Sequence, residues 1–207
     1  MARADPADGP PNFPAVAFDV VVFAASAGGL RALSEVVAGL PADFGAALVA
    51  VQHLDPRHRS LMAEILSRRT RLLVTQAQEG DRLAPGTLFI APPDRHLLVD
   101  PDGTLSLSHS ELVHFVRPSA DLLFDSAAAS YKDRVIAVIL SGTGSDGAMG
   151  VQAVKKMGGT VIAQDEATCE FSGMPAAAVA TGCVDFVLPL PEIPGALATL
   201  IATGGVE

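Results

Sequence analysis

The sequence predicts an α/β fold built on a doubly wound, mostly parallel sheet flanked by helices. Apolar, β-branched runs alternate with helical patterns along most of the chain, which is typical of successive βαβ units. Of the 207 residues, 49% are hydrophobic and only 5% are aromatic, a composition that suits helices packed closely on a sheet. We expect one folded domain over residues 18–203, preceded at residues 1–17 by a disordered leader or linker rich in Pro, Ala, Asp and Gly.

The first part of the chain contains three strand patterns and two helix patterns. The segment DVVVFAA is apolar throughout, and the amphipathic segment LRALSEVVAGL that follows it ends at Gly39-Leu40-Pro41. Ser60 is a candidate N-cap of the second helix. The strands are expected at residues 19–25, 46–52 and 71–77, and the helices at residues 30–40 and 60–69.

The pattern changes around residues 83–109. Strand-like pieces flank the sequence Asp-Pro-Asp-Gly at residues 100–103, which is typical of a tight hairpin turn. We therefore expect an antiparallel hairpin excursion around residues 83–109 inside an otherwise parallel fold. We assign His96, His109 and His114 to this excursion and expect them on the surface.

The alternation of helix and strand patterns resumes after Pro118 and continues to the end of the chain. Helices are expected at residues 119–131, 147–157, 175–182 and 191–202, and strands at residues 134–140, 159–164 and 184–189.

Charge and cysteine content exclude several classes of function. The formal net charge of −9 repels phosphate backbones, so we expect no nucleic-acid partner. Cys169 and Cys183 have no CxxC spacing, which favours two reduced thiols over a disulfide or a zinc site. The N-terminal segment lacks the apolar region of a signal peptide, and no apolar run reaches membrane-spanning length. We expect a cytoplasmic protein that does not insert into membranes.

Three residues with catalytic potential follow three of the expected strands. Ser26 follows the first strand, His53 the second, and Asp146 lies in the glycine-rich loop SGTGSDG after the strand at residues 134–140. Open α/β sheets place reactive groups at the carboxyl ends of their strands. A serine hydroxyl needs a base, and the base needs an orienting carboxylate, so the three residues form a candidate catalytic triad. Its chain order differs from that of α/β-hydrolases, and Ala24 replaces the first glycine of their GxSxG motif.

Backbone amides near these residues are candidate donors to an oxyanion. Ala27 and Gly28 stand at the start of a helix, and the glycines of the SGTGSDG loop let the backbone approach a substrate closely, which adds Thr143 and Gly144.

Each candidate also has a plain structural explanation. Ser26 suits a helix N-cap, His53 a hydrogen-bonded structural histidine, and Asp146 an Asx turn or the N-cap of the helix at residues 147–157. The turn AASAGG suits a nucleotide phosphate but lacks the full GxGxxG spacing. His53, Asp55 and His58 are candidate metal ligands, although the proline between the last two breaks any helix that would align them.

Four motifs in this order, ASAGG, VQHL, RPSADLLF and SGTGSDGAMG, closely resemble the catalytic domain of the chemotaxis protein-glutamate methylesterases, the CheB family. The resemblance runs from about Asp19 to Ile201 and includes a further segment at residues 162–175. It implies hydrolysis of γ-glutamyl methyl esters on chemoreceptors with release of methanol, and often deamidation of receptor glutamines. It also implies that Ser26 is the nucleophile, His53 the general base and acid, and Asp146 the orienting carboxylate, with no metal or organic cofactor.

The implied partner is a methylated cytoplasmic helix of a chemoreceptor or of a related sensor protein, and we expect the enzyme to be a monomer. Two candidates for substrate contact are Arg57 and Arg117, although Arg117 equally suits a structural pair with a carboxylate. Arg68, Arg69 and Arg71 add a positive patch that suits an acidic helix, or else form a solvated helix end.

The sequence departs from the family pattern at three points. Ala27 stands where well-studied members carry threonine, and Thr143 where they commonly carry methionine. Only the Pro-rich leader precedes the domain, where a response-regulator receiver domain is usual, so the chain is either shortened or a naturally single-domain esterase. Three alternatives stay open: an esterase of another signalling system, a catalytically idle signalling adaptor, and a small-molecule carboxylesterase, whose rim should be apolar or aromatic.

Overall fold

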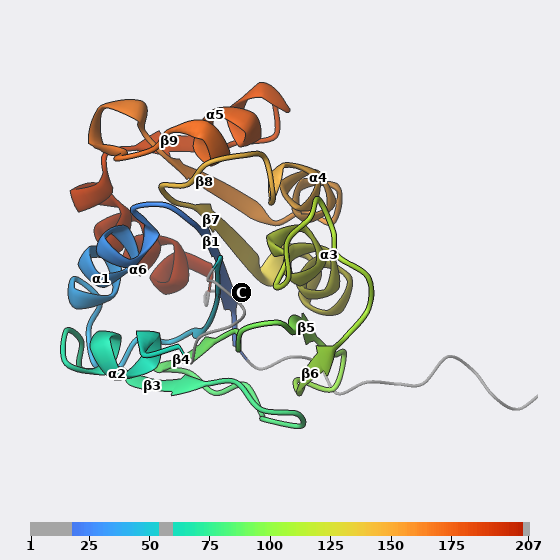
Figure 1. Ribbon diagram of the computed structural model, residues 1–207. Helices are drawn as coiled ribbons and strands as arrows, with labels where there is room; N and C mark the ends of the chain where they lie inside the picture. Colours follow the sequence, from blue (N-terminus) through green and yellow to red (C-terminus); the bar gives the residue numbers. More distant parts are fainter. Residues whose placement is uncertain (1–17, 54–59, 205–207) are drawn as a thin grey trace, which may run out of the picture.

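The computed structural model describes residues 18–53 and 60–204, which form a parallel sheet with helices on both faces (Figure 1). Within these residues the main sheet has seven strands in the order β3-β4-β2-β1-β7-β8-β9, and every neighbouring pair is parallel. The doubly wound, mostly parallel fold predicted from the sequence is therefore confirmed. Its strands are β1 (Val20–Ala25), β2 (Ala47–Gln52), β3 (Leu73–Gln76), β4 (Thr87–Ile90), β7 (Val135–Ile139), β8 (Thr160–Gln164) and β9 (Phe186–Leu188).

The helices divide between the two faces of the sheet (Figure 1). On one face lie α1 (Gly29–Ala38), α2 (Met62–Ser67) and α6 (Ile193–Gly204), and on the other lie α3 (Ala120–Tyr131), α4 (Ala148–Lys156) and α5 (Gly173–Ala180). No helix in the described ranges is long and apolar enough to cross a membrane.

The central strand β1 is buried on both faces, which is why its sequence pattern predicted it. Val20, Val22 and Ala24 pack under α3 and α4, whereas Val21 and Phe23 pack under α1 and α6. A strand covered on both faces has no polar side, so it is a continuous apolar run rather than an alternating one. Full burial of each such valine or phenylalanine contributes roughly 1.5–3 kcal/mol.

The antiparallel excursion is smaller than the expected one at residues 83–109. The strands β5 (His96–Val99) and β6 (Leu105–Ser108) pair antiparallel, which confirms the hairpin. The first part of the prediction was wrong, because Thr87–Ile90 is β4, a parallel strand between β2 and β3. All four residues of β4 are buried, because the strand lies between β3 and β2 and is covered on both faces of the main sheet.

Candidate active site

The carboxyl ends of three neighbouring strands meet at one edge of the sheet. Strand β1 lies between β2 and β7, and Ser26, His53 and the loop carrying Asp146 follow these three strands. Backbone hydrogen bonds extend the sheet to the first two residues, since His53 N donates to Ala25 O at 3.1 Å and Ser26 N donates to Ser141 O at 3.0 Å. The chain continues from β1 into α1 on one face of the sheet and from the neighbouring β7 into α4 on the other face. Open α/β sheets form a crevice between two such strands.

The structure joins His53 to Asp146 directly. His53 Nε2 lies 2.7 Å from Asp146 Oδ2, and the two side chains are 15% and 4% exposed. Because an ionised carboxylate can only accept, Nε2 carries the hydrogen and Nδ1 is the ring nitrogen left to accept a proton.

Ser26 lies beside this pair without a direct bond to it. The Ser26 hydroxyl has no hydrogen bond to the His53 ring in the part of the chain that the structure describes. The serine lies against the glycine-rich loop, because a Cβ added at Gly142 would lie 3.0 Å from the Ser26 Cβ. The structure thus brings all three segments together, but it shows a hydrogen bond only between the histidine and the aspartate.

Asp146 receives its other hydrogen bonds from the N-terminus of α3. Its carboxylate accepts from Ser119 Oγ at 2.8 Å, from Ala120 N at 2.6 Å and from Asp121 N at 3.1 Å. The alternative in which Asp146 caps the helix at residues 147–157 was wrong, because α4 has Gly147 at its N-cap and no side-chain cap. The helix that Asp146 caps begins 26 residues earlier in the chain.

These donors keep the Asp146 carboxyl ionised. Burial by itself raises the pKa of Asp146, but the hydrogen bond from His53 and those from the α3 amides and Ser119 lower it more. The pKa therefore lies below the ordinary value of an aspartate, and the charge that orients the imidazole persists into acid.

Gln52 and two glycines shape the turn that carries Ser26. Gln52 Nε2 donates to Ser26 O at 2.7 Å, and Gly29 N donates to the same oxygen at 2.9 Å. Gly28 has a φ of +74°, and a Cβ at Gly29 would overlap the Gln52 side chain. The small residues of ASAGG are therefore required by backbone geometry and by the close approach of Gln52.

The four backbone amides predicted as oxyanion donors are those of Ala27, Gly28, Thr143 and Gly144. None of them donates a hydrogen bond to another group among the described residues. Gly28 is the N-cap residue of α1, so the first two amides belong to the start of that helix. All four are available to an external acceptor.

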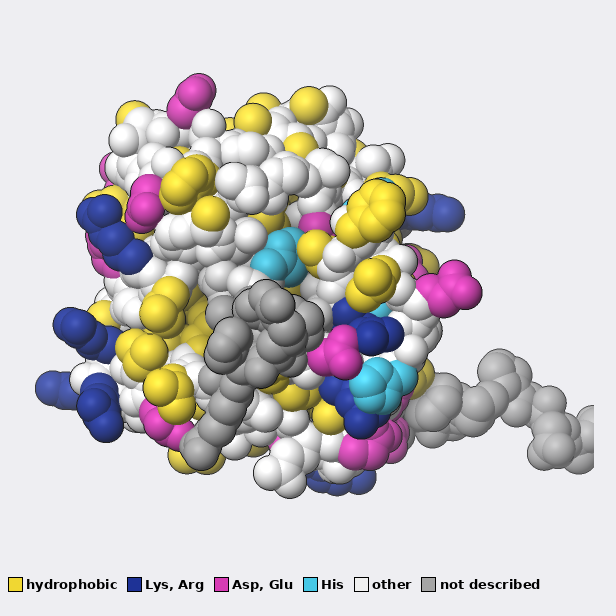
Figure 2. Space-filling model, in the orientation of Figure 1, with side chains coloured by type: hydrophobic (Ala, Val, Ile, Leu, Met, Phe, Trp, Pro, Cys, Tyr) yellow, Lys and Arg dark blue, Asp and Glu magenta, His cyan; other side chains and the backbone are white. Residues whose placement is uncertain are grey.

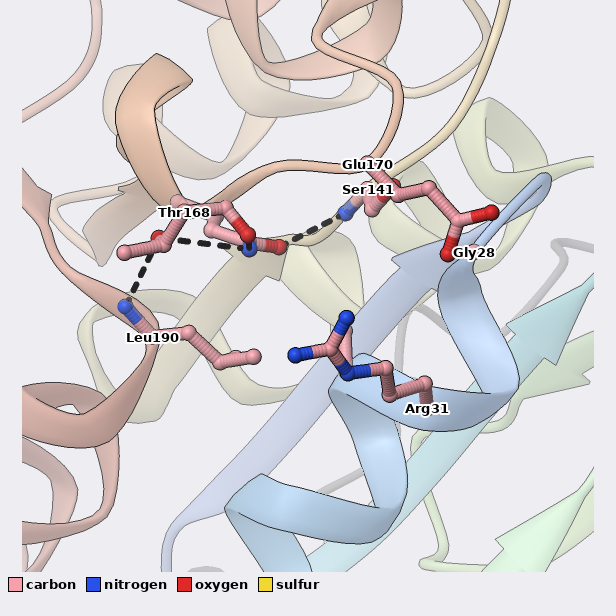
Figure 3. Close-up of a pocket in the computed structure, with 8 residues that line it drawn as sticks. Gly28, Arg31, Ser141, Thr168, Glu170 and Leu190 are labelled. Atoms are coloured by element: carbon pink, nitrogen blue, oxygen red, sulfur yellow. Dashed lines mark hydrogen bonds between the residues drawn. The ribbon is translucent and has the colours of Figure 1, made fainter.

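A small polar pocket lies behind the serine turn, lined in part by Gly28, Arg31, Ser141 and Glu170 (Figure 3). Ser141 Oγ donates to Ala27 O at 2.8 Å and accepts from Phe171 N at 3.0 Å. The segment after β8 thus supports the turn that holds Ser26, which explains why residues 162–175 belong to the pattern noted in the sequence.

His96 is a residue whose role the sequence analysis missed. It was expected on the surface, but its side chain is fully buried, because β5 packs against α3. Its Nδ1 accepts from Ser119 N at 3.1 Å and its Nε2 donates to Glu111 O at 3.0 Å. Burial lowers the pKa of His96, so the ring is neutral and holds Ser119, which in turn donates to Asp146.

Arg117 is engaged within the protein. Its Nε and Nη2 donate to Asp94 Oδ1 at 3.0 and 2.7 Å, and its Nη1 donates to the carbonyl oxygens of His109 and Ser110 at 3.2 and 2.7 Å. This favours the structural alternative for Arg117 over substrate contact. The other candidate, Arg57, lies outside the described residues, as do Asp55 and His58 of the metal alternative.

Exposed arginines gather around α1 and α2, at the edge of the face shown in Figure 2, with hydrophobic side chains between that edge and the middle of the face. Arg31 and Arg69 line one hollow together with Glu35, and Arg68 and Arg71 line the next with Arg69. These four arginines form no ion pair with another described residue.

Comparison with known proteins gives the same assignment throughout. The CheB methylesterase family matches residues 21–197. A putative protein-glutamate methylesterase/protein-glutamine glutaminase of Leptospira interrogans is 39% identical over 176 residues, which cover 85% of this chain and 91% of that protein. A protein-glutamate methylesterase/protein-glutamine glutaminase of Anaeromyxobacter dehalogenans is 46% identical over 182 residues, and the chain spans 53% of its length.

The crystal structure of the CheB methylesterase catalytic domain of Thermotoga maritima superimposes with a TM-score of 0.87 at 40% identity, covering 90% of this chain and all of that one. The parallel sheet, the three converging strand ends and the sequence match over most of the chain agree: this chain belongs to the CheB methylesterase family.

Proposed function

We propose that this chain is a serine hydrolase that cleaves γ-glutamyl methyl esters on chemoreceptors, releasing methanol and restoring glutamate. The observation that carries the proposal is the hydrogen bond between His53 and the buried Asp146 at the strand end beside Ser26, in a member of the CheB methylesterase family. The names of the relatives, which include protein-glutamine glutaminase, support deamidation of receptor glutamines as a second reaction of the same site.

In the proposed mechanism Ser26 Oγ attacks the ester carbonyl carbon while His53 Nδ1 accepts the hydroxyl proton. The hydrogen bond from His53 Nε2 to Asp146 fixes the tautomer and stabilises the imidazolium that forms. The imidazolium then protonates the departing methoxide, and methanol leaves. Water attacks the acyl-enzyme with His53 again as the base, and the glutamate carboxylate is released. The contact between Ser26 and His53 is expected to form when substrate binds, because catalytic hydrogen bonds often close only in the substrate complex.

The amides of Ala27, Gly28, Thr143 and Gly144 supply the oxyanion site in this proposal. Two lie at the start of α1 and two in the glycine-rich loop, and they have no acceptor within the described chain. Loss of one such donor typically raises the barrier by about 3 kcal/mol. Because backbone amides do not depend on side-chain identity, Ala27 and Thr143 alter the fit of the substrate rather than the chemistry.

The proposed substrate is a methylated cytoplasmic helix of a chemoreceptor or a related sensor, and the proposed location is the cytoplasm, with residues 18–203 acting as a monomeric catalytic domain. Such helices are rich in glutamate, and the arginines around α1 and α2, which form no ion pair with a described residue, complement that charge. Charge complementarity of this kind favours the methylesterase over a small-molecule carboxylesterase, for which an apolar or aromatic rim is expected.

The decisive experiment measures methanol release from a methylated receptor by the wild type and by Ser26→Ala, with Ser67→Ala as a control because that serine is exposed on α2. We expect release by the wild type and the control and none by Ser26→Ala. Equal release by Ser26→Ala would exclude the mechanism. Receptor binding without any release by the wild type would instead identify a signalling adaptor.

A further inference from the structure

Helices α3 and α4 cap each other through a pair of aspartates. Asp146, which precedes α4, accepts from the first amides of α3. Asp121, in the first turn of α3, accepts with Oδ1 from Gly147 N at 2.9 Å and from Gly150 N at 2.7 Å, both at the start of α4. Each carboxylate thus satisfies N–H groups that have no partner within their own helix.

Asp121 also holds Asp146 from both sides. The Asp121 amide donates to the Asp146 carboxylate at 3.1 Å, and the Asp121 carboxylate accepts from the amide of Gly147, the residue that directly follows Asp146. The two hydrogen bonds close a ring, so that Asp121 fixes both the Asp146 carboxylate and the backbone next to it.

Two glycines make this close arrangement possible. Gly147 has a φ of +98°, a conformation that favours glycine. A Cβ at Gly150 would lie 2.6 Å from the Phe124 Cβ and 3.1 Å from the Asp121 Cα. The spacing of the glycines in GAMG therefore lets α4 approach α3 until its amides reach the Asp121 carboxylate.

The environment of Asp121 sets it apart from a surface cap. The side chain is buried, and its second oxygen, Oδ2, has no hydrogen bond among the described residues. The imidazole of His114 faces that oxygen, with its Nε2 3.4 Å away. The pKa of Asp121 is raised, mainly by burial and also by the neighbouring charge of Asp146, while the two amide hydrogen bonds act in the opposite direction.

We propose that Asp121 is a positioning residue for the hydrolysis, which holds the Asp146 carboxylate at the distance and angle that His53 requires. The inference rests on the proposed function and concerns the same site. Asp121 acts through Asp146 and touches no reacting atom. A displacement of about 1 Å in a catalytic group is enough to slow a reaction by on the order of 100-fold, so the ring of hydrogen bonds has a direct effect on rate.

Two substitutions separate the position of the carboxylate from its charge. Asp121→Asn retains an acceptor oxygen at the same place and removes the charge, whereas Asp121→Glu retains the charge and moves the acceptor by one carbon–carbon bond. We expect kcat of Asp121→Asn to stay within about threefold of wild type, and kcat of Asp121→Glu to fall roughly 30-fold with little change in KM, because misplacement affects the chemical step. Asp121→Ala, which removes the acceptor, should behave like Asp121→Glu.

A measurement independent of activity reports the same geometry. The proton on His53 Nε2, hydrogen-bonded to Asp146, should give a downfield NMR resonance in the wild type and in Asp121→Asn. We expect this resonance to broaden or disappear in Asp121→Glu. The control is Asp185→Ala, which removes a carboxylate that binds Lys155 of α4 at 2.6 Å and Val161 N at 2.9 Å, away from the site. It should lower thermal stability while leaving kcat and the resonance unchanged.

The outcomes distinguish the two proposals. A folded Asp121→Glu with wild-type kcat and an unchanged resonance would overturn the positioning role, and so would an Asp121→Asn as impaired as Asp121→Glu, since charge would then matter more than place. If the wild type releases no methanol, the proposed function fails, and the resonances of the two variants still decide whether Asp121 positions the pair.

Discussion

Replacement of Ser119 by alanine should weaken both the fold and the site by a predictable amount. Ser119 Oγ donates to Asp146 Oδ1 at 2.8 Å, and both side chains are buried. A hydrogen bond to a charged group contributes about 1.5–3 kcal/mol to stability. In a chain of this length each kcal/mol shifts Tm by about 2–4 °C, so Ser119→Ala should lower Tm by about 3–12 °C near neutral pH.

The size of this interaction also depends on pH, with a sign that follows from the pKa of Asp146. That pKa is lowered in the folded protein, so the associated stability is present above the unfolded value of about 3.9 and is lost as pH falls through the folded value. The deficit of Ser119→Ala should therefore persist from pH 7 down to about pH 4 and shrink below it.

The assay is a double-mutant cycle of Ser119→Ala and Asp146→Asn, measured by denaturant unfolding at pH 7. We expect a coupling free energy of about 1–1.5 kcal/mol, because Asp146→Asn replaces the charged acceptor by a neutral one, whose hydrogen bond contributes that much less. Asp185→Ala serves as a second background that leaves Asp146 intact, and there Ser119→Ala should cost as much as in the wild type. Additive effects of Ser119→Ala and Asp146→Asn would refute the assignment of Ser119 as a support of the Asp146 charge.

Three further predictions concern other parts of the molecule. Burial lowers the pKa of His96, so the unfolded chain binds a proton at a pH where the folded protein does not, and the free energy of unfolding should fall as pH drops below about 6.5. His96→Gln should reduce this slope, and a free energy of unfolding that stays constant between pH 7 and 5 in the wild type would contradict the prediction. Burial and the charges of Asp165 and Glu166 raise the pKa of the Cys169 thiol to about 11, so iodoacetamide at pH 8 should label it far more slowly than free cysteine, and rapid labelling would count against that environment. Gly150→Ala should lower the free energy of unfolding by about 1–3 kcal/mol, because the new Cβ overlaps α3. Alanine at Gly195 should not, because a Cβ there meets no other part of the described fold within 4 Å.

The strands that carry the site were predictable because each is buried on both faces. Strands β1 and β7 are uninterrupted apolar runs, β2 is apolar up to Gln52 at its end, and a residue directly after such a strand lies at the carboxyl edge of a parallel sheet. Ser26 and His53 were therefore identifiable from their place in the chain, and Asp146 from its glycine-rich loop. Strand β4 was misassigned because a run of only four residues, three of them apolar, carries no signal for the direction of its partner strand.

The supporting residues were not predictable in the same way. His96 begins a short strand like many surface histidines, and only the packing of β5 against α3 buries it. One structural alternative for Asp146 was a cap on the helix that follows it, whereas its carboxylate reaches the helix that begins at Ala120. Local pattern describes neighbours along the chain, and these contacts join residues more than twenty positions apart.

The sequence by itself determined the alternation of strands and helices and the edge of the sheet at which a hydroxyl, an imidazole and a carboxylate gather, because hydrophobic periodicity and glycine turns are local properties. Only the tertiary structure decided which hydrogen bonds hold Asp146 against His53, because the donors on α3 and the acceptor on Asp121 come into contact only when α3 packs on α4.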